Sequence, residues 1–244
     1  MIEGGDVLSD RFLKQLDLLG VQLKEEQQEQ FFHFYELLVE WNKVMNLTGI
    51  TDYEEVNEKH FVDSLALAKV MDLRRVDRII DIGTGAGFPG IPLKIAFPHL
   101  EVVLLDSLRK RVHFLDEVIQ KLGLQKISTL HGRAEDYARM PEYREKFDLC
   151  VSRAVANLAV LSEYCIPYVC VGGYFVSYKS GNIDEEIKQA GTSIRVLGGN
   201  LEAVEKFCLP QSEIERSFVK IYKESSTKNK YPRKAGVPGK NPIL

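Results

Sequence analysis

Residues 79–90 constrain the fold of this chain more than any other segment. A short apolar run ends at Asp81, and Pro89 stands where a helix can begin. Four glycines follow the acid in a span of eight residues: Gly83, Gly85, Gly87 and Gly90. This order is typical of a buried parallel strand, a tight turn and the first turn of a helix. A ligand can approach the backbone closely only where no side chain intervenes, so the glycines predict a loop that holds a nucleotide-type cofactor.

Three cofactors compete for this loop. A nucleoside triphosphate is excluded, because Ile and Pro follow Gly90 where a P-loop needs Lys and then Ser or Thr. A dinucleotide stays open, since the last three glycines fit G-x-G-x-x-G and an acid, Asp106, follows about 20 residues on. The third is S-adenosylmethionine, whose fingerprint is an acid followed by G-x-G-x-G. That fingerprint is complete in Asp81, Gly83, Gly85 and Gly87.

The sequence after the loop favours S-adenosylmethionine over a dinucleotide. Residues 101–105 predict a second strand followed by Asp106, whose carboxylate can accept both ribose hydroxyls of either cofactor. None of the ten tyrosines is followed four residues later by lysine, so the catalytic pair of short-chain dehydrogenases is missing. The chain also leaves no room for a separate substrate domain. After a third strand, Ala134 and Glu135 place a small residue and an acid where methyltransferases hold the adenine edge.

Each acidic candidate also has a purely structural role open to it. Asp81 and Asp106 can each cap the helix that follows, because Asp is favoured at that position. Glu135 can lie in the first turn of a helix for the sake of the helix dipole alone.

Strand and helix patterns alternate after residue 75 and predict an α/β fold. Strands are expected near 78–82, 101–105, 127–130, 147–151, 173–178, 201–208 and 216–223, the last two as an antiparallel hairpin at one edge. The fold class is therefore a Rossmann-like methyltransferase with a seven-stranded, mainly parallel sheet. We expect three parts: an N-terminal helical extension (1–75) with helices at 10–19, 24–45 and 54–71, a methyltransferase domain (76–224) and a basic, mobile tail (225–244).

Composition narrows the possible partners. The four cysteines have no C-x-x-C spacing and the five histidines are scattered, so no metal site is expected. The N-terminus lacks a basic start and an apolar core, and Glu163 and Pro167 interrupt the nearest approach to a membrane span. We therefore expect a cytoplasmic protein with no membrane partner.

The charge distribution indicates an anionic partner despite a net charge of −3. From Arg216 onward there are eight basic residues and one acid, Glu224, so this end of the chain carries +7 and the rest carries −10. Such asymmetry is a hint of nucleic-acid binding. Residues 231–240 are rich in Pro and Gly and are expected to stay mobile until bound. A solubilising tail remains the alternative.

Four segments together resemble the bacterial glucose-inhibited division protein B family, the small-subunit ribosomal RNA guanine-N7 methyltransferases. They are W-N-K-V-M-N-L-T (41–48), H-F-V-D-S-L (60–65), D-I-G-T-G-A-G-F-P-G (81–90) and V-S-R-A-V-A (151–156). The likeness covers nearly the whole chain, and K-Y-P-R-K-A-G (230–236) looks like the tail of the longer members.

This resemblance implies methyl transfer from S-adenosylmethionine to one guanine in the decoding-region loop of 16S ribosomal RNA, free or in the small ribosomal subunit. The cofactor-binding candidates are Asp81, Gly83, Gly85, Gly87, Phe88, Asp106, Ser107, Ala134, Glu135 and Arg153. The RNA-binding candidates are Arg133, Arg153, Lys179 and Arg216. The resemblance marks no general base.

Two alternatives stay open at this point. The first is a methyltransferase of the same fold that acts on a small molecule or a protein. The second is a ribosome assembly factor that binds the cofactor without catalysis, with the acidic N-terminal helices as its docking surface.

Overall fold

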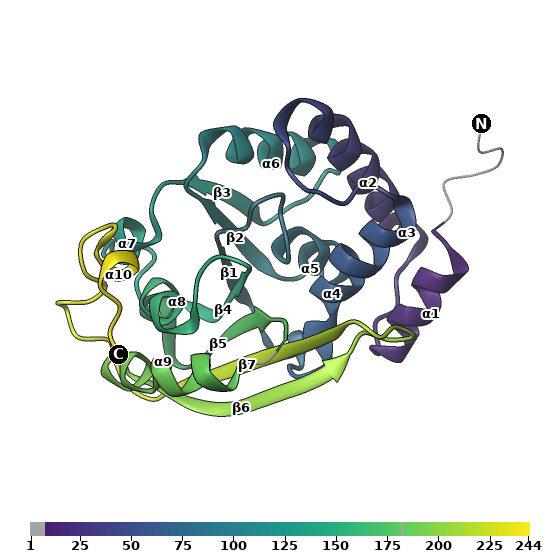
Figure 1. Ribbon diagram of the computed structural model, residues 1–244. Coiled ribbons are helices and arrows are strands. Elements are labelled where there is room, and N and C mark those ends of the chain that lie inside the picture. The colour runs from purple at the N-terminus through teal and green to yellow at the C-terminus, as the bar shows by residue number, and fades with distance from the viewer. Residues whose placement is uncertain (1–7, 182) are drawn as a thin grey trace.

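Seven strands form a single sheet in the computed structural model, which describes residues 8–181 and 183–244. The strand order is β3-β2-β1-β4-β5-β7-β6, and β7 runs antiparallel to both of its neighbours while the other pairs are parallel. The strands are β1 Arg78–Ile82, β2 Glu101–Asp106, β3 Ile127–His131, β4 Phe147–Arg153, β5 Val169–Lys179, β6 Gly199–Cys208 and β7 Glu215–Lys223 (Figure 1). The predicted fold class, including the hairpin at one edge, is confirmed.

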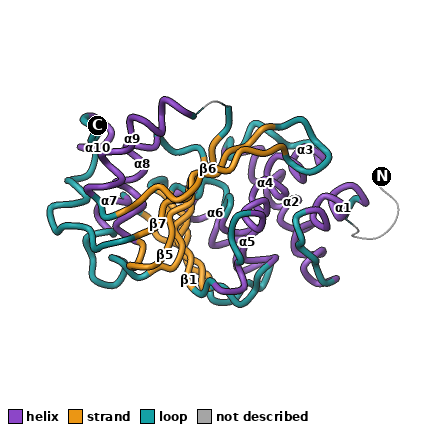
Figure 2. Tube along the Cα trace, turned by 90° about the horizontal axis from the view of Figure 1, so that it is seen from below, coloured by secondary structure: helices purple, strands orange, loops and turns teal. Residues whose placement is uncertain are grey.

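Helices cover both faces of the sheet (Figure 2). Because successive strand residues point to opposite faces, Ile79 packs into the core beneath the N-terminal helices, α5 and α6, whereas Ile80 packs against α7, α8 and α9. The helices are α1 Asp10–Leu18, α2 Glu25–Met45, α3 Tyr53–Val56, α4 Asp63–Leu65, α5 Gly90–Ala96, α6 Arg109–Lys121, α7 Ala134–Tyr137, α8 Leu158–Cys165, α9 Asp184–Val196 and α10 Val237–Lys240. Short 3-10 turns lie at Ala66–Lys69, Leu73–Arg75 and Ile166–Tyr168.

The helix predicted over 54–71 is not continuous. α3 passes into a π-helical turn (Asn57–Val62), then α4 and a 3-10 turn. A π turn widens the helix by one residue and changes which side chains share a face. As a result, His60 and Asp63 both turn toward Arg153 at the end of β4.

Aromatic side chains join the N-terminal helices to the sheet. Ring centroids of Phe12 and Phe31 lie 5.6 Å apart, those of Phe31 and Phe61 5.1 Å, and those of Phe34 and Phe88 5.4 Å. All five rings are buried. Contacts of this geometry stabilise a pair beyond the area it buries. The N-terminal segment therefore shares one apolar core with the loop that follows β1.

The C-terminal tail, predicted to be mobile, is packed against the rest of the molecule in this structure. Arg144 donates to the carbonyl oxygens of Thr227 (2.6 Å) and Tyr231 (2.9 Å), and Arg233 pairs with the buried Glu163 of α8. Figure 1 shows the tail and α10 beside α7 and α8. The sequence predicted a segment that stays mobile until an anionic partner binds it, whereas in this structure polar groups of the sheet domain bind the tail.

Within the described residues, no helix is both long and apolar enough to cross a membrane. Nor do His, Cys, Asp and Glu side chains of that part of the chain gather in a group of three or more that could hold a metal ion.

Candidate active site

The glycine-rich loop lies at the carboxyl end of β1 and is tied to β2. The N–H groups of Gly83 and Thr84 both donate to the carbonyl oxygen of Leu105, at 2.8 and 3.1 Å. Gly85 has φ of +63°, and a Cβ there would meet only the Gly83 carbonyl oxygen, at 4.0 Å. The glycine at this position thus supplies a left-handed turn and leaves its backbone open on one side.

Asp81 holds this loop from beneath. Its Oδ2 accepts hydrogen bonds from Thr84 Oγ1 (2.7 Å) and from the N–H of Gly90 (2.9 Å), the first residue of α5. Its Oδ1 is buried and has no partner among the described residues. Burial raises the pKa of Asp81 to about 7. The capping role that the sequence left open is therefore present, and one acceptor oxygen remains unused.

Asp106 joins the loop to the next strand. Its Oδ2 accepts from the N–H of Gly85 (3.0 Å) and from Arg111 (3.3 Å), and its Oδ1 accepts from the N–H of Leu108 (2.8 Å). The carboxylate thus braces the turn and the start of α6. Its side chain is buried in the protein yet borders a cavity.

That cavity, the Gly-loop cavity, has a volume of about 460 Å³ and opens at the carboxyl ends of β1 to β4. Ligands of open α/β sheets bind at this edge. Six of the predicted cofactor or RNA residues line it: Gly83, Asp106, Ser107, Arg133, Ala134 and Glu135. Arg111, Val155 and Tyr164 also line it and were not predicted.

A second cavity of about 410 Å³, the arginine cavity, shares Ala154 with the first. Three of the predicted RNA-binding residues line it: Arg153, Lys179 and Arg216. Lys59, His60, Asp63 and Tyr178 complete it from distant parts of the chain. The structure therefore groups Arg153 with the RNA candidates, while the fourth, Arg133, lines the Gly-loop cavity.

Asp63 organises the arginine cavity. One carboxylate oxygen accepts from Arg153 Nη1 and the other from Arg216 Nε, both at 2.7 Å. The carboxylate is almost fully buried. Two arginines therefore share one buried counter-charge, which leaves the cavity with excess positive charge.

Phe88 lies under the arginine cavity and does not line the Gly-loop cavity. The Arg153 guanidinium is 5.0 Å from the Phe88 ring centroid, and the His60 ring stacks on the same ring at 4.5 Å. The predicted direct cofactor contact of Phe88 gains no support from this placement. The ring instead supports the two polar side chains by stacking.

His60 is a neutral part of this group. Its Nε2 shares a hydrogen bond with Thr48 Oγ1 (2.9 Å). Burial, followed by the nearby charge of Arg153, lowers the pKa of His60 to about 3. His60 Nδ1 lies 3.4 Å from Arg153 Nη2, so His60 and Asp63 both contact Arg153.

Lys179 anchors the loop between the two cavities. Its Nζ donates to the carbonyl oxygen of Ala156 (2.9 Å) and pairs with Glu186, whose Oε1 accepts from the N–H of Leu158 at the start of α8. Ala154, with φ of +56°, lies in this loop. Lys179 thus fixes the wall that separates the cavities, a role that its charge alone did not indicate.

The Gly-loop cavity fits an adenosine cofactor. Asp106 and Glu135 are carboxylates on adjacent strand ends, and they can accept from ribose hydroxyls and from an adenine amino group. The open backbone at Gly85 belongs to the same loop as Gly83, which lines the cavity.

Solved structures share the fold at low identity. A mutant of MtNAS in complex with S-adenosylmethionine matches at a TM-score of 0.53 and 16% identity, covering 88% of this chain and 84% of that one. The YcgJ protein from Bacillus subtilis matches at a TM-score of 0.52 and 14% identity, covering 68% of this chain and 100% of that one. These likenesses show the fold alone.

Sequence relatives are much closer. The Ribosomal RNA small subunit methyltransferase G of Lachnoclostridium phytofermentans is 53% identical and that of Brevibacillus brevis 49%, with 96% of this chain covered in each case and 96% and 99% of theirs. The family model for rRNA small subunit methyltransferase G, GidB, matches residues 27–215. The resemblance found in the sequence is confirmed: the chain belongs to the GidB family of rRNA small subunit methyltransferases.

Proposed function

We propose that this enzyme transfers a methyl group from S-adenosylmethionine to N7 of one guanine in the decoding-region loop of 16S ribosomal RNA. Membership in the GidB family supports a methyltransferase that acts on small-subunit rRNA. The observation that carries the site assignment is the pair of cavities that share Ala154, one bordered by carboxylates and glycine backbone, the other by cations. The partner is 16S RNA, free or in the small subunit, and the proposed compartment is the cytoplasm.

The Gly-loop cavity is the proposed donor site. Asp106 would bind the ribose hydroxyls, Ala134 and Glu135 the adenine edge, and the loop from Gly83 the amino-acid end. When bound, S-adenosylmethionine supplies an electrophilic methyl carbon on a sulfonium. Because Ala154 lines both cavities, these residues would direct that carbon toward the arginine cavity.

The arginine cavity is the proposed acceptor site. Arg153 and Arg216, fixed by Asp63, present guanidinium groups that suit an RNA phosphate or a base edge. Lys179 and Lys59 line the same cavity, and each forms an ion pair with a glutamate, Glu186 and Glu55. Arg133, on the donor side, would meet RNA that covers the mouth of the Gly-loop cavity.

The chemistry requires placement more than proton transfer. Guanine N7 is an acceptor with an in-plane lone pair, so it can attack without losing a proton. His60, held neutral by its lowered pKa, is therefore not required as a base. Orientation of two reactants can contribute about 7–11 kcal/mol to barrier lowering. We infer that no single side chain is chemically indispensable, and that a target base turned out of its fold is positioned by Arg153 and its supports.

The test is incorporation of labelled methyl from S-adenosylmethionine into three substrates: naked 16S RNA, small ribosomal subunits and total cellular protein. We expect label in one or both RNA samples, at a single 7-methylguanine in the decoding-region loop. Label in protein alone would favour a different substrate. Donor binding without turnover on any substrate would favour an assembly factor.

A further inference from the structure

The C-terminal tail is bound to the wall of the Gly-loop cavity by two acidic side chains. One is Glu163 in α8, and the other is Glu135 at the start of α7. Arg139 and Arg144 hold the intervening tail carbonyls, with Arg139 Nη2 donating to Pro232 O and Arg144 to Tyr231 O. These contacts define the docked tail, residues 227–240.

The first contact is a buried ion pair. Glu163 is only 1% exposed, and both of its carboxylate oxygens accept from Arg233: Oε2 from Nη2 at 2.7 Å and Oε1 from Nε at 3.0 Å. The backbone N–H of Arg233 also donates to Oε1, at 2.6 Å. A two-pronged pair of this kind fixes orientation as well as charge. The next residue in α8, Tyr164, lines the Gly-loop cavity.

The second contact reaches the cavity directly. The N–H of Gly236 donates to Oε1 of Glu135 at 2.8 Å, and Glu135 lines the cavity. Gly236 has φ of +82°, a left-handed turn that aims its N–H at α7 and leads into α10. A hydrogen bond from a fixed backbone donor orients the carboxylate of Glu135.

We propose that the docked tail is a positioning element of the methyl-donor site. It holds Glu135 and the Glu163–Tyr164 turn of α8 in the arrangement that binds the adenine end of S-adenosylmethionine. The proposal rests on the donor-site assignment made above. Arg233 and Gly236 act through Glu163 and Glu135 and need not touch the donor themselves.

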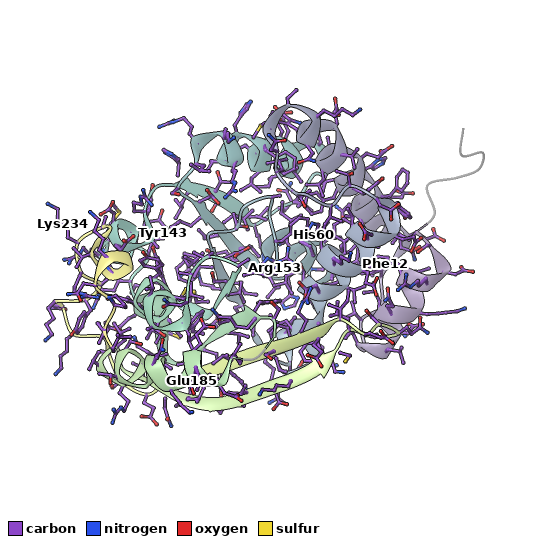
Figure 3. All side chains as sticks on the ribbon, in the orientation of Figure 1. Phe12, His60, Tyr143, Arg153, Glu185 and Lys234 are labelled. Atoms are coloured by element: carbon purple, nitrogen blue, oxygen red, sulfur yellow. The ribbon has the colours of Figure 1, made fainter. Side chains whose placement is uncertain are left out.

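The alternative for a basic tail is a direct RNA-binding arm. Two observations count against it. The charge of Arg233 is neutralised by Glu163. Figure 3 shows Lys234 at the margin of the molecule, away from His60 and Arg153 at the arginine cavity. The exposed Lys234, next to Arg233 in the chain, therefore makes a matched control for the loss of one positive charge.

The experiment compares full-length Arg233→Ala, Arg233→Lys and Lys234→Ala with the natural chain. Calorimetry measures Kd for S-adenosylmethionine, filter binding measures Kd for naked 16S RNA, and circular dichroism checks folding. We expect Arg233→Ala to raise the donor Kd about tenfold and Arg233→Lys about threefold, within the usual range of coupling between sites. Lys234→Ala should change the donor Kd less than about twofold, and no variant should alter the RNA Kd by more than that.

A second measurement uses the natural chain alone, in case Arg233→Ala does not fold. Coupling is reciprocal, so a tail that supports donor binding must be stabilised by the donor. We expect S-adenosylmethionine to slow amide hydrogen exchange at residues 236–240.

Unchanged exchange there, or a folded Arg233→Ala with the natural donor Kd, would overturn the proposal. Weaker RNA binding with unchanged donor binding would identify an RNA arm instead. If the natural chain bound no S-adenosylmethionine, the donor-site assignment itself would be refuted. That result is distinguishable from a failure of the tail proposal.

Discussion

The two cavities that meet at Ala154 are built in different ways. Short segments that directly follow parallel strands form the Gly-loop cavity, and backbone groups supply much of its surface. The arginine cavity is assembled from side chains 36 to 166 residues away from Arg216, around one buried carboxylate, Asp63. A cavity made of strand ends follows from the topology, whereas one made of a charge network depends on each member of the network.

Arg153→Ala should have the largest effect, because it removes one of two partners of a buried carboxylate and the group stacked on Phe88. Losing one partner of a desolvated charge pair costs about 2–5 kcal/mol, so we expect kcat/KM for RNA to fall about 100-fold. The donor Kd should stay within about threefold of the natural value. Radiolabel transfer and calorimetry measure the two quantities.

The control is Arg195→Ala, since Arg195 is exposed on α9 and its Nε donates to the carbonyl oxygen of Gly191 in the same helix. It should leave both quantities unchanged. If Arg153→Ala weakened donor binding as strongly as RNA methylation, the separation between the two cavities would fail.

Asp106→Asn tests the other cavity. The amide cannot give the charged acceptor that the N–H of Gly85 and a ribose hydroxyl would share. Hydrogen bonds to charged groups contribute about 1.5–3 kcal/mol, so the donor Kd should rise at least about tenfold. Affinity for naked 16S RNA should not change. If the variant bound the donor with the natural Kd but lost affinity for naked 16S RNA, the assignment of Asp106 to the donor site would be wrong.

The contributions of Asp81 and His60 to folding stability should change with pH in opposite directions. Asp81 has a folded pKa of about 7, above its ordinary value, so its contribution to stability is lost as pH rises toward 7. His60 has a folded pKa of about 3, below the ordinary value near 6.5, so its contribution is lost as pH falls from 6.5 toward 3.

Between pH 5 and 6.5 these two slopes oppose each other. Asp81→Asn should therefore leave stability that rises with pH, and His60→Gln stability that falls with pH, each by about 1 kcal/mol per pH unit. Urea unfolding at four pH values measures both. If stability changed with pH in the same direction in both variants, the prediction of opposite pH dependences would be refuted.

Glu186→Gln should have the smallest effect. Lys179 would lose its ionic partner but keep the Ala156 carbonyl, and the pair is partly exposed to solvent. Partly exposed pairs contribute about 1 kcal/mol at most, so we expect kcat to fall about threefold. The Kd values for the donor and for RNA should not change, because the loop between the cavities positions ligands rather than binding them. Lys188→Ala, elsewhere on α9, is the matched control and should leave kcat unchanged.

The same contrast explains what the sequence could predict. The strand that ends at Asp81, the loop from Gly83 and the acids at Asp106 and Glu135 are local patterns, and the structure places them together as expected. The network of Asp63 was not predicted, because the π turn at Asn57–Val62 has no pattern of its own and Arg216 lies 153 residues away from Asp63. The resemblance had already marked residues 60–65 as a motif, which was the available signal.

The docking of the tail was not predicted, for a related reason. Composition indicates whether a segment can bury an apolar face of its own, but not whether a carboxylate elsewhere needs a counter-charge. Glu163 had no visible partner in the sequence, and Arg233 lies 70 residues further on.

The buried rings that run from Phe12 to Phe88 bear on how this protein can be dissected. They place residues 8–75 and the sheet in a single cooperative unit, even though one part is helical and the other is α/β. A shortened enzyme that begins at residue 76 would expose the underside of Phe88 to solvent and lose the acid that pins Arg153. The boundary between the N-terminal helices and the α/β part is therefore not a position at which the chain can be truncated.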